Sequence, residues 1–196
     1  MYKQKLVLVG NGMAGLRCVE SIISKDPAAF EITIFGSEPH VNYNRILLST
    51  VLQGNTSFED ITINDRNWYT ENNIQLFTGE TVVKIDKETR KIKTDKEREV
   101  YYDKLIIATG SVPFILPVTG VDKEGVIAFR TIEDCQKMIE TSRKHKKAVV
   151  IGGGLLGLEA ARGLLNLGME VHVVHIADYL MERQLDSTAS LLLQKE

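Results

Sequence analysis

Short apolar runs followed by glycine alternate with helix-like stretches near the start of the chain. Residues 6–9 are continuously apolar, which is typical of a strand buried on both faces. A helical stretch from about residue 13 to residue 25 follows, and Asp26-Pro27 ends it. Residues 31–35 supply a second strand. These elements predict a βαβ unit with a parallel pair of strands and a right-handed crossover.

The pattern changes between about residues 64 and 102, where short β-type pieces replace the long elements. Four pieces, at residues 74–77, 82–85, 90–94 and 99–102, are separated by charged or glycine-bearing turns. They predict a small antiparallel excursion from the parallel sheet. Residues 104–108, centred on Leu105-Ile106-Ile107, predict a return to a buried strand.

The opening pattern then occurs a second time. Residues 147–151 predict a strand that leads into Gly152, residues 155–167 predict a helix that Gly168 ends, and residues 169–175 predict another strand. An internal repeat of this kind indicates two nucleotide-binding lobes. The fold class expected is α/β, with two Rossmann-like lobes built on parallel sheets.

Composition narrows the function classes. The chain has 196 residues, of which 43% are apolar and 26% charged, values typical of a folded globular protein rather than a disordered one. Its net charge of -2 argues against a mainly electrostatic nucleic-acid binder. No apolar run approaches the ~20 residues of a membrane-spanning helix, and residues 1–10 lack a signal-peptide pattern. We therefore expect a cytoplasmic protein with no nucleic-acid or membrane partner.

The cysteine count excludes several kinds of redox site. Cys18 and Cys135 are the only two cysteines, and they form no CxxC pair. Two cysteines cannot hold an iron–sulfur cluster that needs four thiolates from this chain. We expect Cys18, in the first helix, to be a small buried apolar side chain.

Two glycine-rich turns carry the clearest functional signal. Each has the form GxGxxG between a predicted strand and a predicted helix, at residues 10–15 and 152–157. In such a turn the first glycine permits the tight bend, the second lets the backbone approach a pyrophosphate, and the third lets the helix pack on the strand. The helix N-terminus then offers N–H groups and partial positive charge to the phosphates.

The acids that would bind ribose are less regular. In dinucleotide-binding folds an acidic residue follows the glycine turn by ~20 residues, at the end of the second strand. Glu38 can take this role in the first lobe, and the Ser37 hydroxyl could add to it. In the second lobe His175 stands where an acid would mark NAD. Neutral imidazole can hydrogen-bond a ribose and imidazolium can tolerate a 2′-phosphate, so the choice between NADH and NADPH stays open.

The chain resembles the pyridine-nucleotide-dependent flavoprotein reductases, which bind FAD and NAD(P)H in paired Rossmann-like lobes. Within them it is most similar to the branch formed by the large subunit of assimilatory nitrite reductase [NAD(P)H]. The resemblance rests on the two glycine turns and on further strings along nearly the whole chain. These are Tyr43-Asn44-Arg45, Leu48-Ser49-Thr50, Ala108-Thr109-Gly110-Ser111 with Pro113, Arg130-Thr131 with Asp134, Gly157-Leu158-Glu159-Ala160-Ala161 and Leu180-Met181-Glu182-Arg183-Gln184-Leu185-Asp186.

The resemblance implies a role for each matched position. Residues 1–115 would form the FAD lobe and residues 116–196 the NAD(P)H lobe. FAD would be held by Gly10, Asn11, Gly12, Met13, Ala14, Gly15, Ser37, Glu38, Arg45, Val82, Thr109, Gly110 and Arg130. NADH or NADPH would be held by Gly152, Gly154, Leu155, Leu156, Gly157, Glu159 and His175.

The reaction implied is hydride transfer from the nicotinamide to the flavin, in which the cofactors carry the chemistry. We therefore assign no catalytic acid or base and no metal ligand. Related disulfide reductases and peroxidases place a redox cysteine near residues 46–52, and this chain has none there.

The resemblance also implies later parts that this sequence lacks. A return strand with a Gly-Asp pair that contacts the flavin is expected, but no glycine here is followed by aspartate. Both lobes are thus expected to be incomplete. The expected redox partners are downstream modules that carry siroheme and iron–sulfur clusters, or a small subunit of nitrite reductase. The alternatives are a ferredoxin- or rubredoxin-reductase-like flavoprotein, and a truncated nucleotide-binding domain without turnover.

Overall fold

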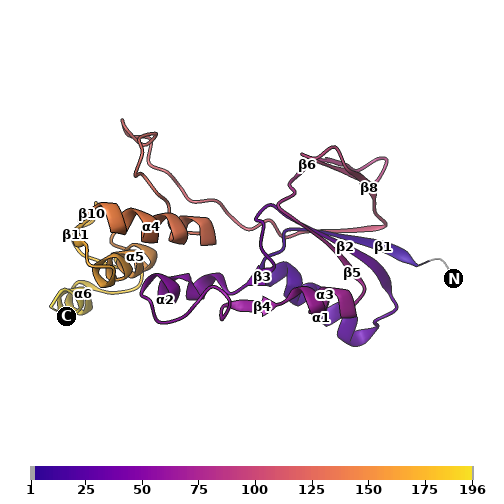
Figure 1. The fold of residues 1–196 in the computed structure, drawn as a ribbon, viewed down its shortest axis with the longest axis horizontal. Coiled ribbons are helices and arrows are strands. Elements are labelled where there is room, and N and C mark those ends of the chain that lie inside the picture. The colour runs from indigo at the N-terminus through magenta and orange to yellow at the C-terminus, as the bar shows by residue number, and fades with distance from the viewer. Residues whose placement is uncertain (1–2, 196) are drawn as a thin grey trace. The chain divides into compact units, whose positions relative to one another are not determined.

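The computed structural model describes residues 3–195, and the chain packs into two units. Unit 1 consists of residues up to 44 together with 62–111, and unit 2 consists of 45–61 together with the residues from 112 on. The segment 45–61 therefore groups with unit 2, although it precedes the second half of unit 1 in the sequence. Figure 1 shows the order of the elements along the chain.

Unit 1 is built on a parallel sheet of four strands. They are β1 (Gln4–Val9), β2 (Phe30–Gly36), β5 (Ile74–Thr78) and β9 (Lys104–Ile107), in the order β5-β2-β1-β9. Helix α1 (Met13–Lys25) connects β1 to β2 and has the bounds that its sequence pattern predicted. In the central strand, Leu8 is aligned with Ile34 on one side and Ile106 on the other.

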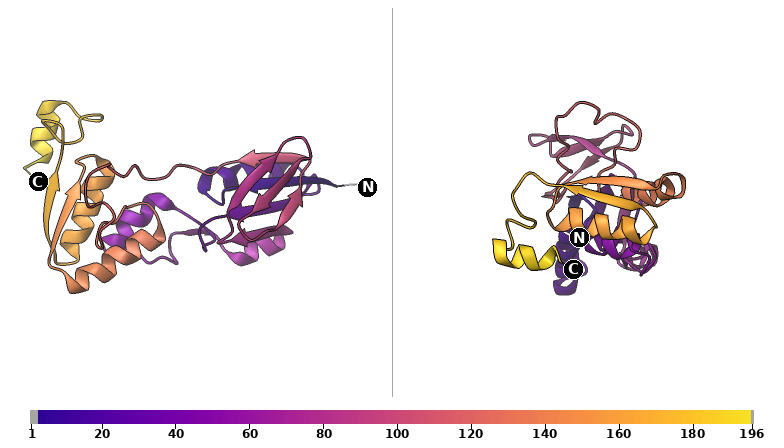
Figure 2. Two further views of the ribbon diagram at one scale, coloured as in Figure 1. Left: turned by 90° about the horizontal axis from the view of Figure 1, so that it is seen from above. Right: turned by 90° about the vertical axis from the view of Figure 1, so that its left-hand side faces the viewer.

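The alternating side chains of β1 bury both faces of this sheet. Leu6 and Leu8 pack against α1 and α3 (Arg66–Glu71), as part of an apolar cluster that includes Tyr69. Val7 and Val9 pack on the other face around Ile92. That residue belongs to an antiparallel sheet of β6 (Val82–Asp86), β7 (Lys91–Thr94) and β8 (Glu99–Tyr101), which covers the face opposite the helices (Figures 1 and 2). Unit 1 thus has three layers.

Two expectations from the sequence are wrong in unit 1. Residues 74–77 do not belong to the antiparallel excursion, because β5 pairs in parallel with β2. The short helix α3, capped by Asp65, makes the crossover that the sequence pattern did not reveal. Cys18 is exposed rather than buried, since it lies on the outer side of α1. Unit 1 also contains a short antiparallel pair, β3 (Asn42–Tyr43) and β4 (Thr62–Asn64).

Unit 2 repeats the opening of unit 1. Strand β10 (Lys147–Ile151), helix α5 (Leu155–Asn166) and strand β11 (Glu170–Val174) form a βαβ unit with a parallel strand pair, as predicted. Helix α4 (Ile132–Lys144) and helix α2 (Leu48–Leu52), which follows the 3-10 turn η1 (Arg45–Leu47), pack against α5 and each other. Helix α6 (Ser187–Leu193) comes last.

A glycine sets the close crossing of α2 and α5. A Cβ on Gly163 would lie 2.5 Å from Leu52 Cγ, so only glycine lets the two helices approach this far. Cys135 of α4 is fully buried nearby, with its thiol 3.9 Å from the Leu48 carbonyl oxygen. Within the described residues, no helix has the length and apolar character that crossing a membrane requires.

Candidate nucleotide-binding sites

The glycine turn of unit 1 lies at the carboxyl end of β1. Gly10 has φ +110°, and its N–H donates to the Phe35 carbonyl of the neighbouring strand at 2.8 Å. A Cβ on Gly10 would lie 2.2 Å from the Ala108 carbonyl oxygen, and one on Gly15 would lie 2.9 Å from the Gly10 oxygen. Around Gly12 the opposite holds, because a Cβ there would meet nothing within 4 Å. The first and third glycines are needed by the fold, and the second faces open space.

The glycine turn of unit 2 has the same geometry. Gly152 has φ +123°, and its N–H donates to the Val174 carbonyl at 2.8 Å. A Cβ on Gly157 would lie 2.0 Å from the Gly152 oxygen, whereas one on Gly154 would meet nothing within 4 Å. Two stretches of sequence with few side chains in common therefore fold into one local structure.

The helices that follow these turns have no side-chain cap. Gly12 and Gly154 are the N-cap residues of α1 and α5, and neither helix donates a backbone N–H to a capping side chain. Asp65, Thr131 and Asp186, in contrast, cap α3, α4 and α6. The first N–H groups of a helix have no partner inside it. In α1 and α5 they lie beside an open glycine, which is the arrangement that binds a phosphate or pyrophosphate.

The predicted ribose acid of unit 1, Glu38, is held by a neighbouring side chain. The Tyr43 hydroxyl donates to Glu38 Oε2 at 2.6 Å, and the Tyr43 ring meets His40 edge-on. Glu38 is half-buried, whereas Ser37 is exposed. Both lie just after β2, so unit 1 brings them to the same end of the sheet as the glycine turn.

Asn11, inside the first glycine turn, faces the protein. Its Oδ1 accepts from the Tyr69 hydroxyl at 2.9 Å, its Nδ2 donates to the His40 carbonyl at 3.3 Å, and its own carbonyl accepts from Asn42 Nδ2 at 3.1 Å. Burial raises the pKa of Tyr69 to about 12. Asn42 and Tyr69 thus fix the shape of the turn, and neither carried a sequence signal, because each lies in an element too short to show periodicity.

The remaining predicted FAD residues of unit 1 lie at three places. Thr109 and Gly110 are exposed and follow β9, and Thr109 N would be 3.0 Å from a Cβ on Gly10. Val82 begins β6, where it pairs with Thr94. The Glu80 side chain, which Thr94 and Arg98 hold, fixes the turn before Val82. Met13 and Ala14 are the first residues of α1.

Glu80 forms a buried ion pair that the sequence did not indicate. Its side chain is 3% exposed, and its Oε1 accepts from Thr94 Oγ1 at 2.7 Å and from Arg98 Nε at 2.9 Å. Burial opposes ionisation of the carboxyl, but these hydrogen bonds and the charge of Arg98 outweigh it, so the pKa of Glu80 lies below its ordinary value. The Arg98 guanidinium also lies 4.1 Å from the centre of the Phe77 ring.

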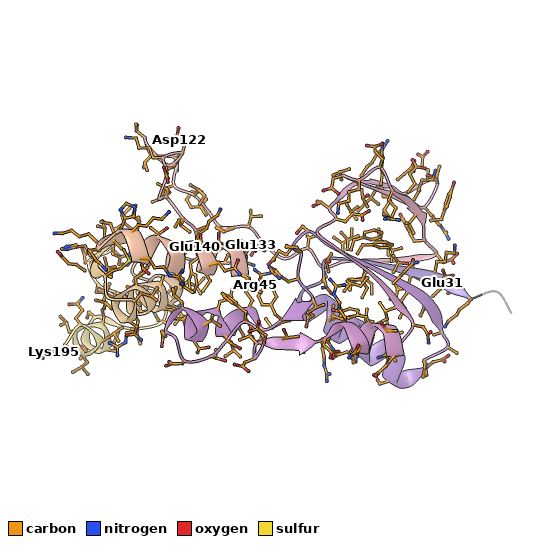
Figure 3. All side chains as sticks on the ribbon, in the orientation of Figure 1. Glu31, Arg45, Asp122, Glu133, Glu140 and Lys195 are labelled. Atoms are coloured by element: carbon orange, nitrogen blue, oxygen red, sulfur yellow. The ribbon has the colours of Figure 1, made fainter. Side chains whose placement is uncertain are left out.

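In unit 2, Arg45 and Arg130 lie together. Arg45 Nη1 donates to the Arg130 carbonyl at 2.5 Å, and Figure 3 labels Arg45 close to the start of α4. The Arg130 N–H donates to Asp134 Oδ2 at 3.0 Å, beside the capping box that Thr131 and Asp134 form. The Arg-Thr-x-x-Asp string is therefore explained locally by helix capping. Arg45 falls in unit 2, apart from the glycine turn of unit 1 in the division of the chain.

The predicted nicotinamide residues of unit 2 lie around the second glycine turn. Leu155 and Leu156, the first residues of α5, are 55% and 54% exposed, which is unusual for leucine beside a sheet. Glu159 is half-buried on the same helix. His175 follows β11, and its two ring nitrogens lie 3.0 Å from Gly153 N and 3.0 Å from Glu182 Oε2.

Comparison with known proteins gives a consistent result. The family model described as pyridine nucleotide-disulphide oxidoreductase matches residues 4–196. The chain is 65% identical over its whole length to nitrite reductase [NAD(P)H] of Bacillus subtilis, and 58% identical to the assimilatory nitrate reductase electron transfer subunit of the same organism. It spans 24% and 25% of the lengths of those proteins.

A solved structure shows the same architecture. NADH:rubredoxin oxidoreductase from Clostridium acetobutylicum matches 99% of this chain and 50% of its own, with a TM-score of 0.88 and 30% sequence identity. The two glycine turns, the α/β fold and the match along nearly all of the sequence agree. The chain belongs to the pyridine nucleotide-disulphide oxidoreductase family.

Proposed function

We propose that this chain accepts electrons from NADH or NADPH onto FAD as the electron-entry region of an assimilatory nitrite reductase. The observation that carries the proposal is the pair of glycine turns. Each ends in an uncapped helix beside a glycine with no atom within 4 Å of its missing Cβ. Two such turns suit two dinucleotides, and an enzyme that reduces a flavin with a nicotinamide needs both.

Unit 1 fits the FAD. The backbone of the Gly10–Gly15 turn would hold the pyrophosphate, and Glu38 would accept the hydroxyls of the adenosine ribose. Tyr43 supports that role, because its hydroxyl already donates to one carboxylate oxygen and fixes the rotamer. Val82, Thr109 and Gly110 would contribute from β6 and from the segment after β9. Arg45 and Arg130 belong to unit 2, and their assignment to FAD rests on the family resemblance alone.

Unit 2 fits the nicotinamide nucleotide through the turn at Gly152, Gly154 and Gly157. The exposed side chains of Leu155 and Leu156 would be covered by the bound nucleotide, and Glu159 would lie further along the same helix. When bound, the two cofactors supply the hydride transfer. The chain itself would hold and orient the rings, which is how proteins contribute to this chemistry.

The nitrite reductase assignment rests on the relatives. The matched protein at 65% identity is named nitrite reductase [NAD(P)H], and the one at 58% an electron transfer subunit of nitrate reductase. The chain spans about a quarter of each. Reduction of nitrite to ammonia, with siroheme and iron–sulfur clusters, would then be done by regions or a small subunit that receive the electrons.

Replacing Gly12 and Gly154, the glycines that face open space, tests the cofactor assignment. The variants are made in the full-length protein. Gly12→Val places a side chain where the chain itself leaves room, so folding should be kept while FAD is lost. Gly154→Val should keep the flavin absorbance but stop its bleaching by NADH. Gly54→Asn, in an exposed turn with φ +79°, is the control, because asparagine tolerates that backbone.

The readouts separate the two lobes. Circular dichroism reports the fold, visible absorbance reports bound flavin, and anaerobic titration with NADH reports electron entry. Full flavin absorbance in Gly12→Val would overturn the FAD assignment. Electrons that reach a rubredoxin-type acceptor but not nitrite would favour the rubredoxin-reductase-like alternative, which the matched oxidoreductase structure represents.

A further inference from the structure

The loop that follows β11 folds back onto the second glycine turn. The Met181 N–H donates to the Gly153 carbonyl at 2.9 Å, and Met181 has φ +58°, a conformation that methionine rarely adopts. A Cβ on Gly153 would lie 2.5 Å from Leu180 Cδ2 and 2.8 Å from His175 Cγ. The loop is therefore seated on the turn, and a glycine at 153 is needed for it to sit there.

Hydrogen bonds define equivalent positions in the two units. Gly10 bonds to Phe35 as Gly152 bonds to Val174, so His175 is the equivalent of Gly36. Two residues further on, Glu38 of unit 1 corresponds to Ala177 of unit 2. Unit 2 therefore has no acid at position 175 or at position 177, the two places where a ribose-binding acid would be expected. If it binds a dinucleotide through a carboxylate, that carboxylate comes from elsewhere.

His175 brings a carboxylate to this place. Its Nδ1 accepts from the Gly153 N–H at 3.0 Å, so the ring is the neutral tautomer with hydrogen on Nε2. That N–H then donates to Glu182 Oε2 at 3.0 Å. The His175 side chain is 13% exposed and that of Glu182 is 33% exposed. Both histidine nitrogens are used inside the chain, whereas the carboxylate keeps an open side.

We propose that Glu182 is the residue of unit 2 that accepts the hydroxyls of the adenosine ribose of NADH, and that His175 is the positioning residue that holds it there. This inference rests on the proposed function, because it presumes that unit 2 binds a nicotinamide nucleotide. In this arrangement His175 does not contact the ribose directly but acts on it through Glu182. The acid is supplied seven residues later in the sequence than the position where the fold usually carries it.

The charge of this pair favours NADH over NADPH. A hydrogen bond from the backbone N–H of Glu182 and another from His175 hold the pKa of the Glu182 carboxyl below its ordinary value, so it is ionised near neutral pH. A carboxylate accepts ribose hydroxyls and repels a 2′-phosphate, and the neutral imidazole does not compensate. Arg183 follows it in the sequence, is exposed, and is a cation that could pair with such a phosphate.

Binding of fragments of the cofactor tests the proposal apart from turnover. Calorimetry with the flavin-loaded protein should measure the affinity for two ligands. ADP-ribose contains the adenosine ribose, and reduced nicotinamide mononucleotide lacks it. Glu182→Gln should weaken ADP-ribose about tenfold and leave the mononucleotide unchanged. It should also narrow the gap between ADP-ribose and its 2′-phosphate. His175→Ala should weaken ADP-ribose less, and should add nothing to Glu182→Gln.

Two other carboxylates serve as matched controls. Glu170 pairs with His172 at 3.0 Å at the other end of the same strand, so Glu170→Gln removes a Glu–His contact remote from the turn. Asp178 is exposed within the loop itself. Neither Glu170→Gln nor Asp178→Asn should change the affinity for ADP-ribose or for the mononucleotide. If Asp178→Asn loses ADP-ribose binding and Glu182→Gln does not, then Asp178 is the acid that binds the ribose and the proposal is wrong.

The possible failures are distinguishable. If the wild-type protein binds neither ADP-ribose nor NADH, the proposed function fails, and the inference fails with it. If the wild type binds both and Glu182→Gln binds them equally well, only the inference is overturned. A loss of mononucleotide binding as large as that of ADP-ribose would show that Glu182 only holds the loop. The inference would also be contradicted if the wild-type protein bound the 2′-phosphate of ADP-ribose more tightly than ADP-ribose itself and Arg183→Gln abolished that preference.

Discussion

Removing Arg98 should destabilise the antiparallel layer of unit 1 by leaving a charge buried. Arg98 is the cation that faces the Glu80 carboxylate, whose side chain is 3% exposed. Breaking a buried ion pair by deleting one partner costs about 3–5 kcal/mol, and an isolated cation–π contact adds about 0.5–1 kcal/mol. Because the Arg98 side chain is itself 42% exposed, water screens the pair and brings the cost below the range for a fully buried one. We expect Arg98→Met to cost about 2–3 kcal/mol.

Hydrogen exchange measured by mass spectrometry is the suitable assay, because it reports on β7 and β8 whatever the length of the protein. A loss of 2–3 kcal/mol should speed amide exchange there about 30- to 150-fold. Lys93→Met is the matched control, because it removes the Lys93–Glu97 pair of the same turn, which solvent screens and which therefore adds little to stability. Equal exchange in Arg98→Met and wild type would refute a buried, charge-compensated Glu80.

The pH dependence of the same region follows from the sign of the shift. The folded-state pKa of Glu80 lies below its ordinary 4.5, so the unfolded chain takes up the proton first. The contribution of Glu80 to stability is therefore complete above pH 4.5 and is lost as the pH falls below that value. In Glu80→Gln the acid-dependent loss of protection in β7 should be smaller, because the titrating group is gone.

Three further predictions concern buried groups. Burial raises the pKa of Cys135 to about 11, so iodoacetamide at pH 8 should label the exposed Cys18 and spare Cys135 until the protein unfolds, as peptide mapping would show. The pKa of Tyr69 is raised to about 12 from 10, so unit 1 should lose stability as the pH rises through that range, and Tyr69→Phe should abolish the alkaline part of a denaturation series. Gly163→Val should lower the urea midpoint of unit 2 by overpacking Leu52, at a cost of about 1–3 kcal/mol, whereas an unchanged midpoint would contradict the close helix crossing.

The long elements and the glycine turns could be predicted from the sequence because their signals are local. Helix α1 and strands β1, β2, β10 and β11 show clear periodicity or apolar runs, and each turn carries its own glycines. Helix α4 was not predicted, although its Thr131-x-x-Asp134 capping box and its apolar spacing would have indicated it.

The other features depend on contacts between distant residues. Helix α3 has six residues and is mostly polar, so nothing in its sequence shows that β5 joins the parallel sheet. Glu80 and Arg98 are an ordinary charge pair until folding buries one of them. The prediction that His175 binds the ribose directly came from its position after a strand. That position could not show that both ring nitrogens are already used by Gly153 and Glu182.

The membership of residues 45–61 in unit 2 has a consequence for biosynthesis. Leu48 and Leu52 of α2 emerge from the ribosome well before α4 and α5, the helices that bury them, have been translated. Meanwhile residues 62–111 complete the sheet of unit 1. A nascent chain of this protein therefore carries an apolar helix that must wait for its partners, at the stage when aggregation is most favoured. Unit 1 can mature during translation, whereas unit 2 must close a long loop in the chain before its core exists.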